Sequence, residues 1–332
     1  MPRCEGQCGT DELVRSLAYG GTVQVVAATT TGLVEEAHAR HGTWPTATAA
    51  LGRVLTAALL MGSSLKDDEK ILIQICGNGP LGRVVGEATA RGQVRGYVQN
   101  PHVDPELKAA GKMDVASAVG REGVVVVIKD LGLKEPYQGT APLVSGEIAE
   151  DLTYYLAQSE QIPSAMALGV LVGPAEAGAS QGGHDHAGRG VAAEASGSGW
   201  KVLAAGGLLV QALPSARQEV LAGLENRLAR LPQVSSLVAR GRTAQGLIDE
   251  LLEAGKAGSY QVLDRYPVEF DCGCSRERVA RALVSLGTEE LARLDQEGQG
   301  AQLTCRFCNT RYSFGPQEIH DLLRQLEEPG QP

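Results

Sequence analysis

The chain has 332 residues, a formal net charge of −9 and a sequence pI near 5.3. The acidic balance argues against a nucleic-acid-binding protein, because neutralising a phosphate backbone needs clustered lysine and arginine side chains. No apolar run reaches the roughly 20 residues that span a bilayer, and the opening segment lacks the apolar core of a secretory signal. We therefore expect a cytoplasmic protein of more than one domain, with neither nucleic acid nor membrane as a partner.

Residues 10–213 are predicted to form a large α+β domain of sheets and helices. Alternating or β-branched runs predict the strands, and apolar residues at helical spacing predict the helices. A stretch at 174–199 rich in Gly, Ala, Ser and His interrupts the domain and is expected to be a flexible insertion. The expected strands are 22–29, 70–76, 81–88, 93–98, 123–129 and 200–213, and the expected helices are 45–60 and 145–159.

Residues 214–258 are predicted to form a helical linker. Ser215 and Gln218 have the spacing of a capping box before a stripe of leucines, which predicts a helix at 215–231. A second amphipathic helix is expected at 243–254. Helices of this length are marginal in water on their own, so the linker is expected to be metastable and to depend on a neighbouring surface.

Four cysteines characterise the last predicted domain, residues 259–328. Cys272 and Cys274 form a C-x-C pair, Cys305 and Cys308 form a C-x-x-C pair, and 30 residues separate the pairs. Two such cysteine pairs can together bind one tetrahedral Zn²⁺ per chain. The module has few large apolar residues, so metal ligation, worth on the order of 10 kcal/mol in zinc-dependent peptides, is expected to stabilise its fold. The site is either an inert structural zinc site or a site whose cysteines react with oxidants.

An oxidant that removes the thiolate ligands would unfold such a module. If the folded module supports the linker, loss of zinc would free the linker and expose its leucine stripe. Leu221, Leu224 and Leu228 are therefore the candidate residues for binding the apolar surface of unfolded client proteins.

The two cysteine pairs are predicted to oxidise in a definite order. A C-x-x-C turn reaches disulfide geometry with little strain, whereas two cysteines separated by one residue in an extended segment fit it poorly. We expect Cys305 and Cys308 to oxidise before Cys272 and Cys274. Mass mapping of partly oxidised protein measures the order, and a C-x-C pair oxidised first would contradict it.

Longer stretches carry a family resemblance over nearly the whole chain. They include ALGRVLTAALLMGSSLK at 50–66, GNGPLGRVVGEATARGQVRGYVQNP at 77–101 and AAGGLLVQALPSA at 204–216, together with the cysteine pattern. The chain resembles the heat shock protein 33 family of bacterial redox-regulated holdase chaperones. The resemblance implies that zinc is bound by all four thiolates in a reduced, largely inactive state. It also implies that oxidation forms the disulfides Cys272–Cys274 and Cys305–Cys308, releases zinc and yields an ATP-independent holdase that often dimerises.

Two features depart from this resemblance, namely the insertion at 174–199 and the pair Cys4 and Cys8. His184 and His186 in the insertion could bind a metal, but a solvated loop is favoured, and Cys4 and Cys8 are interpreted as incidental thiols.

Two other functions stay open. One is a thiol-disulfide oxidoreductase, although its C-x-x-C motif normally opens a helix, whereas here a hairpin is expected. The other is a passive structural zinc module that mediates protein interactions. The histidines and carboxylates form no recognisable catalytic triad, so we expect a protein that is not an enzyme.

Overall fold

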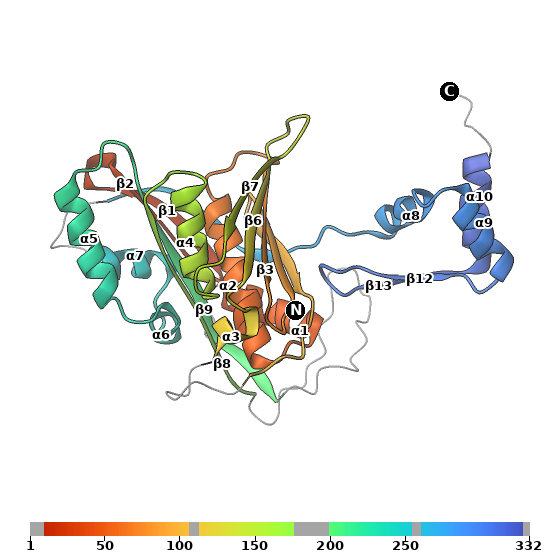
Figure 1. The fold of residues 1–332 in the computed structure, drawn as a ribbon, viewed down its shortest axis with the longest axis horizontal. Coiled ribbons are helices and arrows are strands. Elements are labelled where there is room, and N and C mark those ends of the chain that lie inside the picture. Colours follow the sequence, from red (N-terminus) through yellow and green to blue (C-terminus); the bar gives the residue numbers. More distant parts are fainter. Residues whose placement is uncertain (1–9, 106–112, 176–198, 254–259, 328–332) are drawn as a thin grey trace, which may run out of the picture. The chain divides into compact units, whose positions relative to one another are not determined.

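The computed structural model describes residues 10–105, 113–175, 199–253 and 260–327. The chain divides into two compact units, Met1–Asp271 and Cys272–Pro332, and Figure 1 shows their elements. Cys4, Cys8 and most of the predicted insertion, with His184 and His186, lie outside the described residues.

The first unit contains a five-stranded sheet, called the first sheet here, with the strand order β10-β1-β2-β9-β8. All its neighbouring strands pair antiparallel. The predicted strands at 22–29 and 200–213 are confirmed as β2 and β9, two of its three inner strands. The bounds are Glu12–Ala18 for β1, Val23–Thr29 for β2, Ser164–Pro174 for β8, Trp200–Ala212 for β9 and Gln261–Pro267 for β10.

A six-stranded second sheet has the order β11-β5-β4-β3-β6-β7. In β3 the alternating Ile71, Ile73 and Ile75 are completely buried, which explains the period-two pattern of this segment. The predicted hairpin of 81–88 and 93–98 is confirmed as the antiparallel pair β4 and β5. The bounds are Lys70–Gly77 for β3, Arg83–Thr89 for β4, Gln93–Val98 for β5, Gly123–Asp130 for β6, Tyr137–Pro142 for β7 and Glu269–Phe270 for β11.

Helix α2, Pro45–Gly62, contacts strands of both sheets, and nearly all its residues are buried. Small residues let the sheets and neighbouring helices approach its backbone closely. A Cβ atom on Gly52 would lie 2.6 Å from Val34 and 2.9 Å from Val170, so only glycine fits there without a shift. The remaining helices around this core are α1, Thr31–His41, α3, Val115–Val119, and α4, Ile148–Gln158.

Three helices of the predicted linker pack on the opposite face of the first sheet (Figure 1). They are α5, Gln218–Arg230, α6, Val234–Ala239, and α7, Ala244–Leu252. Their apolar side chains form one cluster with alternate residues of β1, β2 and β9. The first sheet is therefore apolar on both faces, with α2 on one side and the linker helices on the other. The cluster includes Val14, Val23, Val25, Ala27, Leu208, Leu224, Leu237, Leu247, Ile248 and Leu251.

The first unit extends beyond the boundary at 258/259 that we expected from the sequence. Residues 261–267 pair with β1, and residues 269–270 pair with β5, so contacts with the first unit continue to Asp271. The pairing joins residues about 250 positions apart, as Arg15 and Asp264 show. Sequence periodicity carries no information about a partner so distant along the chain.

The second unit holds three helices and one hairpin of strands β12 and β13. Ser275 caps the first of the helices, as its hydroxyl accepts a hydrogen bond from the Arg278 N–H. Six residues form the buried core, namely Leu283, Leu291, Tyr312, Phe314, Ile319 and Leu323. The bounds are Arg276–Val284 for α8, Thr288–Glu297 for α9, Ala301–Thr304 for β12, Arg311–Phe314 for β13 and Pro316–Glu327 for α10.

Each helix in the described part of the chain is too short or too polar to traverse a bilayer.

The carboxylate of Asp11 caps α1 from a distant part of the chain. Its Oδ2 accepts a hydrogen bond from the Leu33 N–H at 2.7 Å. Burial nevertheless raises the pKa of Asp11 from its ordinary value to about 6, against the opposing effect of the hydrogen bonds from the first turn of α1. The folded state thus binds this proton more tightly than the unfolded chain does.

Replacing Asp11 should change how stability depends on pH. A raised folded pKa adds stability that is complete below about pH 4 and is lost as pH rises through about 6, a change of roughly 2–3 kcal/mol. We expect Asp11→Asn, which keeps an oxygen acceptor but cannot ionise, to flatten this decline. Urea unfolding between pH 4 and pH 7 measures it. The control is Asp68→Asn, whose wild-type side chain is 90% exposed, and equal slopes for Asp11→Asn and wild type would contradict the expectation.

Candidate metal centre

The four C-terminal cysteines come from two segments of the second unit. Cys272 and Cys274 lie in the extended segment before α8, and Cys305 and Cys308 lie in the turn between β12 and β13. The predicted hairpin turn is confirmed, because the Cys305 N–H donates to the Thr310 carbonyl at 2.9 Å and the Asn309 N–H donates to the Cys305 carbonyl at 2.8 Å. Asn309 adopts a φ of 58°, a left-handed conformation that asparagine tolerates better than most residues.

The four Sγ atoms converge within 4.8 Å of one another. Two separations between the pairs are short: Cys272 Sγ lies 3.6 Å from Cys305 Sγ, and Cys274 Sγ lies 3.3 Å from Cys308 Sγ. A tetrahedral zinc with Zn–S bonds near 2.3 Å holds its sulfurs about 3.8 Å apart. The two separations are slightly shorter than this value, and all four sulfurs lie within 4.8 Å of one another, so the donor set fits one tetrahedral metal ion.

Polar contacts around the sulfurs influence their protonation. Tyr312 Oη lies 3.0 Å from Cys274 Sγ, and Thr310 Oγ1 lies 3.2 Å from Cys308 Sγ. Hydrogen bonds from the Cys272 and Cys305 thiols lower the pKa of Cys308, whereas burial raises the pKa of Cys274 to about 11. Such a cluster keeps some of its protons in the absence of a metal and must release them when a metal binds.

Two arginines brace the C-x-C segment against the rest of the unit. Arg276 donates to the Ser313 carbonyl at 2.8 Å, pairs with Glu318 at 2.6 Å and lies 4.4 Å from the centre of the Phe314 ring. Arg278 donates to the Gly273 carbonyl, between the two cysteines, at 2.6 Å. These contacts link the first pair of cysteines to β13, which follows the second pair.

We did not anticipate Tyr312 from the sequence as a partner of a thiol. It lies four residues after Cys308 and is 5% exposed. Its position in β13, two residues before the buried Phe314, places it on the inward face of the hairpin. The strand period was a signal that could have identified it, because residues two apart share one face.

The candidate client-binding leucines belong to the first unit and not to the metal centre. Leu224 is only 3% exposed, and Leu228 packs against the same cluster on the first sheet. Leu221 is partly buried. In this conformation Leu224 and Leu228 face the protein interior.

Comparisons with known proteins agree over nearly the whole chain. The family model described as Hsp33 protein matches residues 11–315. The chain is 46% identical to the 33 kDa chaperonin of Geobacillus kaustophilus, covering 94% of this chain and 97% of that protein. It is 42% identical to the 33 kDa chaperonin of Enterococcus faecalis, covering 94% and 96% respectively. The crystal structure of the 33 kDa chaperonin (heat shock protein 33 homolog) of Thermotoga maritima matches with a TM-score of 0.79 and 36% identity, covering 95% of this chain and 98% of that chain.

Removing the Tyr312 hydroxyl should weaken metal binding. A hydrogen bond to a coordinating thiolate stabilises its charged form, and losing an outer partner of this kind typically lowers metal affinity about 10-fold or more. We expect this loss for Tyr312→Phe in a zinc competition titration against a chromogenic chelator. Tyr137→Phe, in the first unit, is the control. An affinity equal to that of wild type would show that the hydroxyl does not support the thiolate.

Proposed function

The chain belongs to the Hsp33 family, whose members are chaperones, and on this premise we propose that it is a redox-regulated, ATP-independent holdase. In this proposal the reduced, zinc-bound protein is inactive. Oxidation releases the zinc, and the protein then binds unfolding client proteins and prevents their aggregation. It would act in the cytoplasm under oxidative stress and form a homodimer when oxidised.

The observation that carries the proposal is the convergence of four thiols in a unit with a small core. Cys272, Cys274, Cys305 and Cys308 would together hold one Zn²⁺ per chain in the reduced state. Among the described residues of the second unit, six form the buried apolar core, and so small a core rarely supplies more than about 3–5 kcal/mol. The bound ion would link the two cysteine-bearing segments, so its loss would remove a large share of the folding free energy.

The activating step is a two-electron oxidation for each disulfide. Two thiolate sulfurs lose one electron each and form an S–S bond, while one molecule of hydrogen peroxide is reduced to water with the uptake of two protons. We propose the pairing Cys272–Cys274 and Cys305–Cys308, which follows from the family resemblance. All four sulfurs lie close enough for other pairings, so the pairing needs direct mapping.

The linker would transmit this change to clients. In the reduced state Leu224 of α5 and the leucines of α7 are buried against the first sheet. The hold of α5 is modest, because Leu224 is its single fully buried residue, whereas α7 buries five residues. Release of the linker would expose Leu221, Leu224 and Leu228 as an apolar stripe, the kind of surface that binds unfolded chains.

The site geometry favours a switch over an oxidoreductase. Catalytic C-x-x-C motifs open a helix, whose N-terminus stabilises the attacking thiolate. Cys305 and Cys308 instead lie in a hairpin turn, with Cys308 1% exposed. A buried sulfur is poorly placed for repeated exchange with substrates, so a protein that is not an enzyme remains our proposal.

The function is tested by the aggregation of a chemically unfolded client, followed by light scattering without ATP. We expect no suppression by reduced, zinc-loaded protein, and suppression at about one chaperone per client after treatment with peroxide at raised temperature, in step with zinc release. Suppression of client aggregation without loss of zinc would show that holdase activity does not depend on the redox switch. Zinc retained in peroxide, with no suppression, would identify a passive structural module, and catalytic turnover of disulfides would identify an oxidoreductase.

The leucine stripe is tested in the fully oxidised protein. Each truncated leucine loses about 1–2 kcal/mol of apolar contact with a client. We therefore expect Leu221→Ala combined with Leu228→Ala to weaken client binding about 10-fold or more, as measured by fluorescence anisotropy of a labelled unfolded protein. Leu286→Ala is the control, because Leu286 is already 54% exposed in the second unit. Unchanged affinity in the double variant would place the client site elsewhere.

A further inference from the structure

Residues 260–271, called the edge segment here, cover an edge of each sheet of the first unit. Strand β10 pairs antiparallel with β1 at the edge of the first sheet, and β11 pairs with β5 at the edge of the second. The edge segment ends at Asp271, directly before Cys272 of the metal centre. The chain that covers both edges is thus covalently continuous with the first cysteine pair.

Strand β10 contributes little to the core, although it covers strand β1, which is well buried. None of the seven residues of β10 is fully buried, whereas Leu13, Val14, Ser16 and Ala18 of β1 are. Val262 and Leu263 of β10 are 37% and 39% exposed. The strand is therefore held by its backbone ladder and a few polar contacts, and each of its backbone hydrogen bonds adds only about 0.5–1.5 kcal/mol net.

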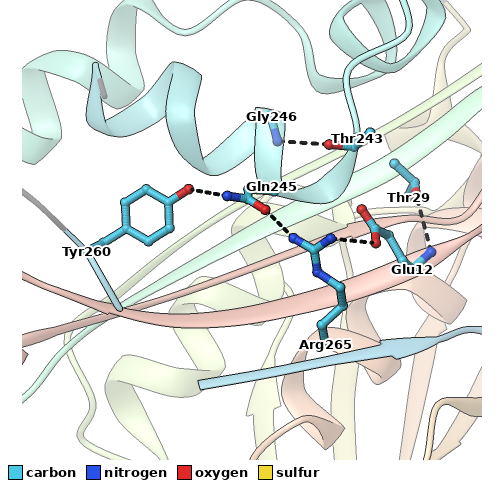
Figure 2. A network of polar contacts seen from close by, with 7 residues as sticks. All are labelled: Glu12, Thr29, Thr243, Gln245, Gly246, Tyr260 and Arg265. Atoms are coloured by element: carbon cyan, nitrogen blue, oxygen red, sulfur yellow. Dashed lines mark hydrogen bonds and ion pairs between the residues drawn. The ribbon is translucent and has the colours of Figure 1, made fainter. Parts of the chain in front are cut away.

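Besides the ion pair between Arg15 of β1 and Asp264 of β10, the polar contacts form a network that we call the β10 latch, made of Glu12, Gln245, Tyr260 and Arg265. Figure 2 shows Arg265 of β10 between Gln245 of α7 and Glu12 of β1. Tyr260 accepts a hydrogen bond from Gln245 at 3.2 Å and donates one to Asp249 at 2.6 Å. The latch joins β10 to a linker helix, but Arg265 is 49% exposed, and exposed ion pairs typically contribute less than about 1 kcal/mol.

One residue of β10 destabilises the pairing of this strand with the first sheet. The hydroxyl of Tyr266 is buried and has no hydrogen-bond partner among the described residues. Leaving such a group unpaired costs about 1–3 kcal/mol. Detachment of β10 would return this hydroxyl to water, so the cost favours release.

We propose that β10 is a detachable edge strand, and that its release opens the edge of β1 to an extended segment of an unfolded client, which adds to the first sheet as a new strand. This inference rests on the proposed function and adds a binding mode to it. A vacated edge presents a row of unpaired backbone N–H and C=O groups, the usual template for strand addition.

Strand β10 itself indicates what the vacated edge would bind. The edge is filled here by an extended segment with largely exposed side chains, so main-chain pairing governs what binds there and side-chain identity matters little. Recognition of this kind suits an unfolded protein of no fixed sequence. The leucine stripe and the β1 edge would then be released together, because α7 and β10 are joined through the latch.

Hydrogen exchange read by mass spectrometry tests the binding mode, with reduced, carboxymethylated α-lactalbumin as the unfolded client. In oxidised protein we expect peptides covering 12–18 and 261–267 to lose protection together. With the client bound, 12–18 should regain protection while 261–267 does not. Protection of 261–267 retained in the client complex would overturn the inference. Concentration-dependent protection of 12–18 without a client would assign the edge to a second copy of the chain and overturn the client assignment.

Latch variants test the release. Tyr260→Phe combined with Arg265→Ala should raise exchange of 261–267 about three- to tenfold in the reduced protein, whereas Tyr266→Phe should lower it. Arg242→Ala is the matched control, because Arg242 makes an exposed ion pair with Glu250 of α7 that does not involve β10. Equal exchange in all variants would show that the latch does not hold β10.

A covalent lock separates this inference from the proposed function. Arg15 and Asp264 are cross-strand partners, and such Cα atoms lie about 4.5–5.5 Å apart, within disulfide range. Arg15→Cys with Asp264→Cys, closed by glutathione disulfide while zinc protects the native cysteines, should still release zinc in peroxide but hold client at least about fivefold more weakly. The single variant Asp264→Cys should hold normally. Full holding by the locked protein overturns the inference alone, and no holding by wild type overturns the proposed function.

Discussion

The second unit depends on the convergence of four thiols from two segments about 30 residues apart. Its apolar core comprises six buried residues on short helices and one hairpin, too few to offset the conformational entropy of the chain comfortably. Arg276 and Arg278 orient the C-x-C segment, and the hairpin turn orients the C-x-x-C pair. A metal held by both segments would make the stability of the unit conditional on thiol chemistry, and such a condition is what a redox switch needs.

The first unit has the opposite character. Helix α2 is buried between two sheets, and the first sheet carries a second apolar cluster on its other face. The rest of the first unit therefore retains a large core of its own if the linker helices leave. The elements at its margin, α5 and β10, bury few side chains and are the parts that can detach at least cost. Stability is thus concentrated in the core around α2, and lability in α5 and β10.

The pattern of apolar residues along the chain predicted most of the helices and strands that bury one face. The strand alternation around Ile71, Ile73 and Ile75 and the Ala- and Leu-rich helix at 45–60 formed where expected, because burial on one face leaves a period in the sequence. The helices expected at 215–231 and 243–254 formed as α5 and α7, although α5 begins only at Gln218, after Arg217, and the short helix α6 was not expected. The cysteine spacing likewise predicted the cluster. By contrast, the sequence placed the start of the last domain at 259, whereas the edge segment joins the first unit through pairs such as Arg15 with Asp264.

The sequence by itself determined the local periods, the turn of the C-x-x-C pair and the family, since each depends on residues near one another in the chain. Only the tertiary structure decided which strand covers β1, that Tyr312 reaches Cys274, and that Leu224 faces the first sheet. The physical reason is that strand pairing and side-chain contact depend on distances in space between residues far apart in sequence. A segment such as β10, with little burial and thus a weak period, leaves no sequence signal of its partner.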